Sequence, residues 1–468
     1  MDKNIKRLLT AILLMLFTQV NVAGPLEFYH QRYLEKQKSY LLPTSIKTAH
    51  FEQWIDHEHP AVGTFVQRYY LDETYGPSKD SPVFFYICGE AACSPKALSG
   101  AIRDYAQTFH AKLVALEHRF YGKSQPYATL TTDHLLSLTT TAALQDLANF
   151  QRTISARNHW TGKWIAFGGS YPGSLSAYYR MRYPELIVGA LASSAPVMAK
   201  EDFYEYDAHV ASVAGPDCAA KIRLAVSDIE EALANADKNR IAAIKTLFNA
   251  EEVHDDIDFL YLVADTAAAA VQYGMHDEFC SSLANNNTAL EGYAHFARTL
   301  FARWDITALE LTAEGAMSEN PEDYSKGLGL RQWFYQSCKE YGYWQNANPD
   351  RMHSSRSAFI NNDYHRNICL RLFGIDTPVN TDYTNELFYL PLMKLSTSNI
   401  YFTNGSNDPW STLSMTEKNG NNTNPNLTYT IIENAAHCDD LHSPKSSDSI
   451  SLQSARQAFE YLLNQWLN

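Results

Sequence analysis

The segment Gly168-Gly169-Ser170-Tyr171-Pro172-Gly173 has the composition of a nucleophile elbow, a strand–serine–helix turn that exposes a serine hydroxyl. An apolar run precedes the segment and a helix-like run follows it. Glycine before the serine permits a sharp turn, and the start of a helix favours negative charge near the hydroxyl. A strict G-x-S-x-G motif has glycine where Pro172 stands, and Gly173 comes one residue later. The segment predicts a serine nucleophile, with an ordinary glycine-rich turn as the alternative.

A serine nucleophile needs a base and an acid that orients the base. Two later loops offer them, each after a strand-like run: Asp408 follows 399–403 and His437 follows 429–432. Serine, aspartate, histidine is also the chain order that accompanies such an elbow. We expect Asp408 to accept the imidazole N–H and His437 to take the proton of Ser170. The alternatives are an Asx turn at Asp408 and a structural loop histidine at His437.

The oxyanion formed in such a reaction needs two N–H donors. The Tyr171 N–H comes with the elbow, and we expect the second donor to be Gly89, in the loop after the strand-like run 83–88. Glu90 would then lie at the mouth of the site, where it could hold a substrate amine or a neighbouring side chain. His118 also follows a strand-like run, but we expect it to belong to a buried brace of ion pairs and hydrogen bonds.

The elements that must position these residues alternate along the chain. Buried strands are predicted at 83–88, 112–117, 164–167, 187–192 and 399–403, and a further strand is predicted at 429–432. Helices are predicted at 142–154, 174–183, 222–233, 241–248 and 452–467. Alternation of strands and helices favours a mostly parallel sheet with helices on both faces. Between about 201 and 385 strand signals are sparse and helical spacing prevails, which predicts a helical insertion.

Length and charge limit the classes of protein. The chain has 468 residues, enough for two domains or for one domain with a large insertion. Its formal net charge of −14 gives no attraction to phosphate backbones, so nucleic acid is not expected as a partner. Residues 1–23 have the basic start, short apolar core and small residues of a secretory signal peptide, with an uncleaved anchor as the alternative. No later stretch is long and apolar enough to span a membrane, so we expect a secreted, periplasmic or lysosome-like vesicular location.

Seven cysteines in an exported chain predict disulfides and at least one leftover thiol, although several cysteines could instead be buried and reduced. Asn286, Asn421 and Asn426 begin glycosylation sequons. Asn404 also begins one, but it follows a strand and could be packed in the core. The motif His57-Glu58-His59 lacks the spacing of a metal site, and no phosphate loop is present, so neither a metal nor a cofactor is expected.

With these residues in place, the chain resembles the prolyl-specific serine carboxypeptidase family, which includes lysosomal Pro-X carboxypeptidase, dipeptidyl peptidase II and thymus-specific serine protease. The matching segments, in order along the chain, are 50–57, 84–86 with 89–90, 117–124, 168–171, 192–197, 333–338, 404–405 with 408–410, and 436–437. They span nearly the whole chain after the signal segment. The most distinctive are 117–122 and 408–410.

The resemblance implies the fold class α/β, an α/β-hydrolase fold with a large, mainly helical inserted cap domain. The hydrolase domain would comprise 24–200 and 386–468, and the cap 201–385. It also implies hydrolysis next to proline, often at acidic pH, with Ser170, Asp408 and His437 as nucleophile, acid and base. Two disulfides are implied as well, Cys218 with Cys280 and Cys338 with Cys369.

Within the family the chain looks most like the thymus-specific branch. Cys438 replaces the second histidine that follows the base in the other two branches, and Cys88 and Cys93 flank Gly89-Glu90 in place of the usual residues. An acid of the dipeptidyl branch corresponds to Phe334, which argues against recognition of a peptide's amino end. A rigid apolar proline suits an aromatic slot. The candidates to line it are Trp333, Phe334, Tyr335 and Trp410, unless they are core aromatics of the insertion.

The sequence therefore predicts a serine exopeptidase that acts on proline-containing peptides, either as a Pro-X carboxypeptidase or as a dipeptidyl peptidase. Two other classes remain as alternatives. One is an esterase or lipase with the same triad, and the other is a catalytically silent hydrolase-fold binding protein. A homodimer is one option for its assembly.

Overall fold

The computed structural model describes residues 43–325, 328–417 and 424–468. The signal segment predicted at 1–23 and the sequon at Asn421 lie outside these residues.

A single large sheet forms the centre of the described structure. Its order is β1-β2-β4-β3-β5-β6-β9-β10. The strands are β1 (Lys47–Trp54), β2 (Thr64–Asp72), β3 (Val83–Ile87), β4 (Lys112–Leu116), β5 (Trp164–Gly169), β6 (Gly189–Ser193), β9 (Ile400–Gly405) and β10 (Thr428–Ile432). The pairs from β4 to β10 are parallel, whereas β1 with β2 and β2 with β4 are antiparallel. This order and these directions confirm the predicted α/β-hydrolase fold.

The six predicted strands are present, each within two residues of its expected limits. The sequence reasoning missed β1 and β2, because it searched for continuous apolar runs. Along β1 and β2 many of the buried residues alternate with exposed ones, as expected for strands at the border of a sheet.

The helices fall before, within and after the predicted insertion. The helices are α3 (Ala101–Thr108), α4 (Thr132–Leu135), α5 (Thr140–Asn158), α6 (Tyr171–Arg182), α7 (Tyr204–Ala214), α8 (Pro216–Ala234), α9 (Lys238–Leu247), α10 (Asp256–Gln272), α11 (His276–Asn285), α12 (Ala289–Trp304), α13 (Leu330–Gln336), α14 (Asn362–Phe373), α15 (Thr381–Thr384), α16 (Leu390–Leu392) and α17 (Ile450–Leu467). The two short strands β7 (Lys200–Asp202) and β8 (Gly342–Trp344) pair in parallel beside them.

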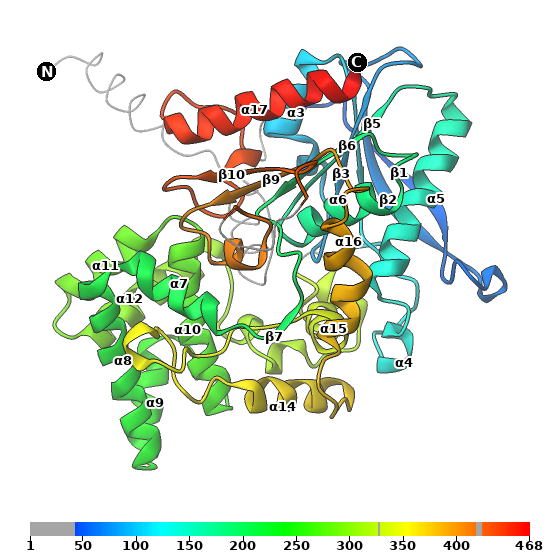
Figure 1. Ribbon diagram of the computed structural model, residues 1–468. Helices are drawn as coiled ribbons and strands as arrows, with labels where there is room; N and C mark the ends of the chain where they lie inside the picture. Colours follow the sequence, from blue (N-terminus) through cyan, green and yellow to red (C-terminus); the bar gives the residue numbers. More distant parts are fainter. Residues whose placement is uncertain (1–42, 326–327, 418–423) are drawn as a thin grey trace, which may run out of the picture.

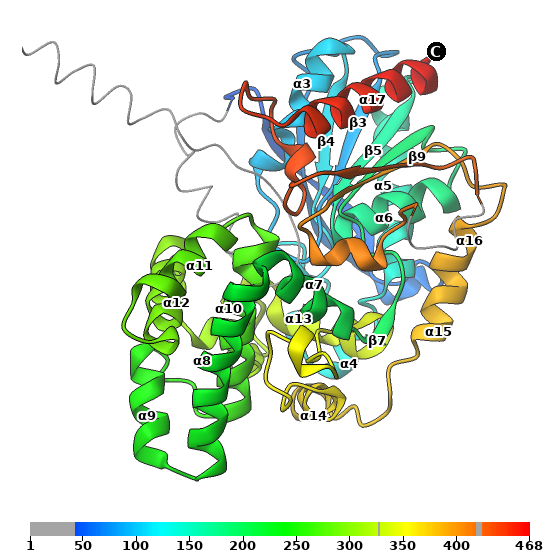
Figure 2. The same cartoon turned by 60° about the vertical axis from the view of Figure 1, so that its left-hand side comes forward.

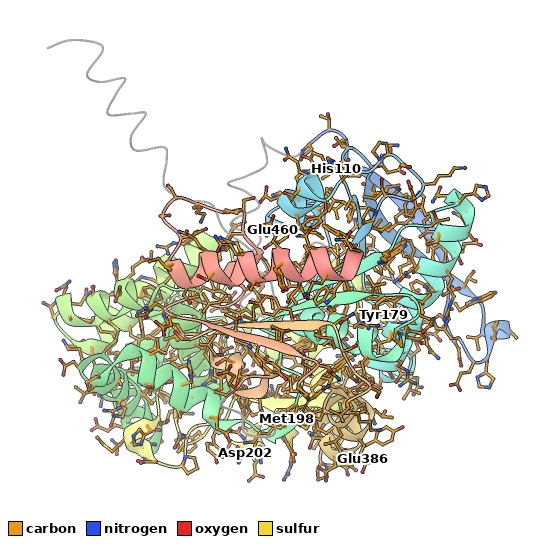
Figure 3. The ribbon with its side chains drawn as sticks, turned by 45° about the horizontal axis from the view of Figure 1, so that its top comes forward. His110, Tyr179, Met198, Asp202, Glu386 and Glu460 are labelled. Atoms are coloured by element: carbon orange, nitrogen blue, oxygen red, sulfur yellow. A yellow bond between two sulfur atoms is a disulfide. The ribbon has the colours of Figure 1, made fainter. Side chains whose placement is uncertain are left out.

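Helices cover both faces of the sheet. Every side chain of β3 is buried, with Phe85 on the α5 and α6 side and Phe84 on the α3 and α17 side. Phe459 of α17 packs against Phe167 and Tyr105, which closes the second face. Figure 3, in which Glu460 is labelled, shows α17 lying across the strands. Burial of alternate strand residues on opposite faces holds the layers together.

The helices α7 to α15, within the predicted cap 201–385, gather on one side of the sheet, as Figures 1 and 2 show. The buried residues of α10 and α12 belong to the same contiguous apolar cluster as those of α5 and α6. The cap and the hydrolase part therefore share a core. The limits 201 and 385 remain a prediction.

Three disulfides are present among the described residues. Cys218–Cys280 and Cys338–Cys369 confirm the two pairs implied by the resemblance. The third, Cys88–Cys93, was not predicted, and Cys438 is left as a buried thiol.

The asparagines of the described sequons differ in exposure. Asn404 is packed inside the protein, as anticipated, whereas Asn286 and Asn426 lie at the surface. None of the described helices is both long enough and apolar enough to cross a membrane.

Candidate active site

Ser170 stands between β5 and α6 in a strained conformation. Its backbone has φ 61° and ψ −127°, and its side chain does not cap the helix. A non-glycine residue held in such a region costs roughly 1–3 kcal/mol and persists only where its surroundings enforce it. The Ser170 N–H donates to the Ser193 carbonyl at 2.7 Å, and the Ser174 N–H donates to the Ser170 carbonyl at 2.9 Å. The strain leaves the hydroxyl out of the helix's own hydrogen bonding, as a nucleophile requires.

The glycines of this turn explain why the motif departs from G-x-S-x-G. A Cβ on Gly168 would lie 2.1 Å from the Pro172 carbonyl oxygen, and one on Gly173 would lie 2.7 Å from the Ser193 oxygen. Gly173 therefore makes the close approach to β6. Pro172 is tolerated because the first N–H groups of a helix have no partner within it. The shifted glycine thus preserves the elbow.

Asp408 and His437 lie in the loops after β9 and β10 and meet in the interior. His437 Nδ1 is 2.8 Å from Asp408 Oδ2, and both side chains are fully buried. The other carboxylate oxygen of Asp408 accepts the Trp410 N–H at 3.0 Å, at the start of the 3-10 helix Pro409–Leu413. A carboxylate fixed in this way can orient the imidazole and hold its proton on Nδ1.

The electrostatics of this pair favour a charged imidazole. Burial disfavours the imidazolium, but the Asp408 carboxylate and then Cys438 outweigh burial, so the pKa of His437 is raised well above its usual value. The same carboxylate stabilises the imidazolium that forms when His437 accepts a proton.

The loops of Ser170 and His437 are in direct contact. A Cβ on Gly169, the residue before the serine, would lie 2.8 Å from the Cys438 Sγ. The Cys438 N–H donates to the Ser194 hydroxyl at 2.9 Å, next to the residue that accepts the Ser170 N–H. Within the described residues no hydrogen bond links the Ser170 hydroxyl to His437. In free enzymes such bonds are often long and tighten when substrate is bound.

The Asp440 carboxylate fastens the histidine loop to the sheet. It accepts the Ser193 hydroxyl at 2.5 Å and the Thr403 hydroxyl at 2.7 Å, so it joins β6 and β9 beneath the site. Arg456 of α17 donates to the carbonyls of residues 439, 440 and 442. The loop after His437 is thereby held from the hydrolase side.

Gly89 lies against the elbow, as an oxyanion donor would. A Cβ on Gly89 would be 2.4 Å from Pro172 Cγ and 3.5 Å from Tyr171 Cδ1, so only glycine fits. Neither the Gly89 N–H nor the Tyr171 N–H donates to another described residue. The two candidate donors are therefore adjacent, and neither is used by another described residue.

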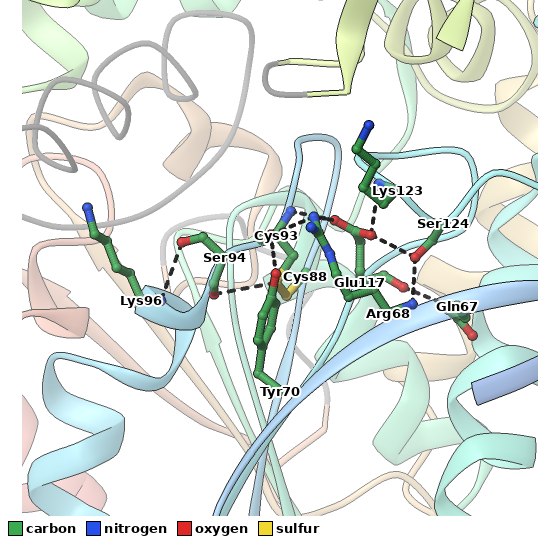
Figure 4. The surroundings of a disulfide bond; sticks show 10 residues. All are labelled: Gln67, Arg68, Tyr70, Cys88, Cys93, Ser94, Lys96, Glu117, Lys123 and Ser124. Carbon is green, nitrogen blue, oxygen red and sulfur yellow. Dashed lines mark hydrogen bonds and ion pairs between the residues drawn. A yellow bond between two sulfur atoms is a disulfide. The ribbon is translucent and has the colours of Figure 1, made fainter. Parts of the chain in front are cut away.

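The Cys88–Cys93 disulfide closes the loop that carries Gly89 and Glu90, as Figure 4 shows. The Cys93 N–H donates to Glu117 at 2.9 Å, and the Cys93 carbonyl accepts Tyr70 at 2.9 Å and Arg68 at 3.0 Å. Glu117 and its ion-pair partner Arg68 thus anchor the far end of the loop. The near end, Cys88, donates its N–H to the Leu116 carbonyl at 3.2 Å.

The candidate substrate residues differ in where the structure places them. Glu90 is buried, and its charge contributes to the raised pKa values of Tyr121 and Tyr171. Trp333 packs on the Tyr171 ring at 5.5 Å, and Trp410 packs on Tyr343 at 5.4 Å. Trp333 therefore lies beside Tyr171, and Trp410 lies beside Asp408, to which it donates its N–H.

Tyr335 is placed elsewhere: it packs on Phe373 of α14, at 5.3 Å. Phe334 is buried and takes part in no ring contact among the described residues. Consecutive residues of a helix point in different directions, so 333, 334 and 335 cannot all face one slot.

Two glutamines at the site were not predicted, and His118, expected in a buried brace, lies at the elbow. Gln336 Nε2 donates to the Tyr171 hydroxyl at 2.8 Å, and His118 Nε2 lies 3.0 Å from the same oxygen. Burial lowers the pKa of His118 to about 4, so its imidazole is neutral. Gln272 of α10 contacts the loop of Asp408 and the loop of His437. No motif marks the two glutamines, and only the folded arrangement brings them here.

The described residues contain no group of three or more His, Cys, Asp or Glu side chains arranged to hold a metal ion. His57, part of the His57-Glu58-His59 motif, instead pairs with Asp146 at 2.6 Å.

The family model described as "Serine carboxypeptidase S28" matches residues 53–459 of the chain. A probable serine protease EDA2 from Arabidopsis thaliana is 38% identical over 378 residues, which cover 77% of this chain and 74% of the relative. The thymus-specific serine protease of Mus musculus is 28% identical, with 86% and 84% covered. The lysosomal Pro-X carboxypeptidase of Bos taurus is 28% identical, with 90% and 87% covered.

Proposed function

The chain belongs to the serine carboxypeptidase S28 family and is a serine-type peptidase, and we propose that it is an exopeptidase that hydrolyses peptide bonds next to proline. The proposed nucleophile, base and acid are Ser170, His437 and Asp408. The observation that carries the assignment is the buried Asp408–His437 pair, 2.8 Å apart, in a loop that contacts the elbow of Ser170.

In the proposed reaction Ser170 Oγ attacks the scissile carbonyl carbon while His437 Nε2 takes the hydroxyl proton. The carbonyl oxygen becomes an oxyanion, which accepts the N–H groups of Gly89 and Tyr171. Asp408 stabilises the imidazolium. The imidazolium then donates its proton to the amine as the C–N bond breaks. The amine departs, and the acyl group remains on Ser170 Oγ as an acyl-enzyme. Water, deprotonated by His437, hydrolyses the ester and restores the Ser170 hydroxyl.

Two observations support exopeptidase action and a preference for proline. Ser170 is 2% exposed and Asp408 is 0% exposed. A site buried beneath helices admits a flexible chain end more readily than a folded protein. Trp333, which packs on Tyr171, and Trp410, which donates to Asp408, are rigid apolar side chains of the kind that suits a proline ring.

The proposed location is a secreted, periplasmic or lysosome-like compartment. The three disulfides fit an oxidising compartment of this kind.

The deciding experiment uses a single peptide that contains one internal proline and a proline near each end. Mass analysis of the products should show release of terminal fragments next to proline, and the end released identifies carboxypeptidase or dipeptidyl peptidase action. Cleavage only at the internal proline would contradict the exopeptidase assignment. Turnover of short acyl esters with no peptide cleavage would favour the esterase alternative. A serine-reactive phosphonate should label Ser170, and absence of labelling would indicate a silent binding protein.

A further inference from the structure

Gln272, the last residue of α10, touches both loops of the proposed acid–base pair. Its main-chain carbonyl accepts the His437 N–H at 2.9 Å. Its side-chain oxygen Oε1 accepts the Trp410 Nε1–H at 3.1 Å and the Tyr206 hydroxyl at 2.7 Å. The residue is 2% exposed, so water does not compete for these bonds.

Each of the two oxygens of Gln272 fixes a different catalytic loop. Trp410 is the second residue of the 3-10 helix that Asp408 caps, and Asp408 accepts the Trp410 N–H. Its indole N–H therefore ties the acid loop to the Gln272 side chain. The carbonyl of Gln272 ties the base loop to the same residue. One cap residue thus spans the acid and the base.

The end of α10 is itself held firmly. The Gln272 amide donates to the Tyr273 hydroxyl, and the Tyr273 ring lies 6.3 Å from the His437 ring in an edge-on arrangement. Gly274 follows with φ +68°, a conformation that favours glycine, and a Cβ there would meet Ala436 at 3.5 Å. The helix end and the histidine loop therefore meet over several residues.

We propose that Gln272 is a positioning residue, which sets the distance and angle between Asp408 and His437 and makes the cap part of the catalytic apparatus. The inference rests on the proposed triad. Misplacement of a catalytic group by about 1 Å can reduce a rate by about a hundredfold, so a residue that spans both loops has a measurable effect.

The test compares Gln272→Met with Gln272→Glu. Methionine keeps the length of the side chain and removes the acceptor, whereas glutamate retains an acceptor oxygen for Tyr206 and Trp410. We expect Gln272→Met to lower kcat and the rate of phosphonate labelling by about tenfold or more, with KM nearly unchanged. Gln272→Glu should recover most of the rate at a pH where His437 is neutral.

A pH profile provides the readout that loss of stability alone would not move. The titratable groups around the imidazole are Asp408, Cys438 and Tyr273, with His209 facing Asp408. A loosened Asp408–His437 contact weakens the interaction that raises the pKa of His437. The acid limb of kcat/KM should therefore move to lower pH in Gln272→Met, and to higher pH in Gln272→Glu because of the added negative charge.

Gln151→Met is the matched control. Gln151 is also buried, accepts a tyrosine hydroxyl, that of Tyr179, at 2.7 Å, and donates to the Leu186 carbonyl at 2.7 Å. It lies on α5 and touches neither catalytic loop. Its replacement should reduce thermal stability by a comparable amount and leave the acid limb in place.

Three outcomes would overturn the inference. The first is that Gln272→Met keeps the parent kcat and its acid limb does not move. The second is that Gln151→Met changes kcat and the acid limb as much as Gln272→Met does. If Gln272→Met does not fold, Tyr206→Phe is measured in its place, because it removes the hydrogen bond from Tyr206 to Gln272. The third outcome is that Tyr206→Phe has the pH profile of the parent. Phosphonate labelling of the parent, located by peptide mass, is measured first. Its failure at Ser170 would instead contradict the proposed function.

Discussion

The main chain of Ser170 and that of His437 are fixed by different parts of the molecule. Ser170 bonds to β6 and to its own helix α6, so it is held entirely by the sheet and its crossover. His437 bonds to Gln272 of the cap, while Asp440, three residues later, bonds to Ser193 and Thr403 of the sheet. Among the described residues, the main chain of Ser170 is therefore fixed by the hydrolase part, and the main chain around His437 is fixed by both parts, although the Tyr171 side chain also contacts Gln336 and Trp333 of the cap.

This difference separates two kinds of perturbation. A change in the sheet or in the loop of Gly89 should affect the attack of the serine and the oxyanion while leaving the imidazole's protonation intact. A change in the cap should affect the Asp408–His437 contact and therefore the pH dependence. The rate and the pH profile together can locate a defect on one side or the other.

Ser170→Ala should have the largest effect, because it removes the nucleophile itself. We expect kcat/KM on a prolyl peptide to fall by about 10,000-fold or more, and phosphonate labelling to vanish. Ser176→Ala is the control, since Ser176 is a buried serine of α6 that donates to the Leu191 carbonyl at 2.9 Å. That variant should keep most of the activity. Retention of more than about a thousandth of the parent rate in Ser170→Ala would refute the assignment of the nucleophile.

Asp408→Asn should come next, with a loss of up to about 10,000-fold in kcat, because asparagine no longer enforces the required imidazole tautomer. The Asp408 carboxylate is the main group that raises the pKa of His437. Its removal should lower that pKa and move the acid limb of the residual activity to lower pH.

Asp207→Asn is the control for this shift. Asp207 is a fully buried carboxylate of α7 that accepts hydrogen bonds from Ser354 and Ser355. Its replacement should affect stability and leave the limb where it is. An acid limb that stays in place in Asp408→Asn would show that another group controls the profile.

The two sides also differ in how far the sequence predicts them. Ser170, Asp408 and His437 each follow a strand of the sheet within a few residues, and parallel strands bring their carboxyl ends to one edge of the sheet. Local apolar runs and turn residues are therefore enough to suggest that they meet. The elbow, the α/β-hydrolase fold and two disulfides could be anticipated in the same way or by resemblance.

The rest depends on contacts that no local pattern encodes. Gln272 ends an alanine-rich helix, and its role follows only from how α10 docks against loops far along the chain. Cys88–Cys93 could not be paired from spacing alone. Tyr335 was grouped with Trp333 because both are aromatic, although neighbouring helix positions face different ways.

The double variant Cys88→Ser/Cys93→Ser tests the nucleophile side with a smaller effect. Loss of one oxyanion donor costs about a hundredfold to a thousandfold in kcat, and a loosened loop should cost less, about tenfold. The acid limb of the pH profile should not move, because the loop does not contact His437.

Cys218→Ser/Cys280→Ser supplies the contrast, because this pair closes a loop with a sequence separation of 62 residues against 5 for Cys88–Cys93. The chain-entropy model assigns the longer loop about 2 kcal/mol more stabilisation. We therefore expect the cap variant to lose more thermal stability and less kcat. An equal loss of kcat in both variants would indicate general loosening and not a role for the loop of Gly89.

Glu340→Gln should have the smallest effect, seen in stability. Glu340 is half-buried where the cap meets α5, and its carboxylate accepts the Thr140 N–H at 3.0 Å and the Thr140 hydroxyl at 2.8 Å. Burial, opposed by these bonds, raises the pKa of Glu340 to about 7. The folded chain therefore binds this proton more tightly than the unfolded chain, and its stability declines as pH rises from the ordinary carboxyl value towards 7. Glutamine does not ionise, so the Tm of Glu340→Gln relative to the parent should increase between pH 5 and 8.

Glu322→Gln, at an exposed ion pair with Lys123, should show no such trend. If the Tm difference between Glu340→Gln and the parent did not change with pH, the Glu340 carboxyl would have the ordinary pKa of a glutamate. The cap would then meet the nucleophile side without a group between them that titrates near neutral pH.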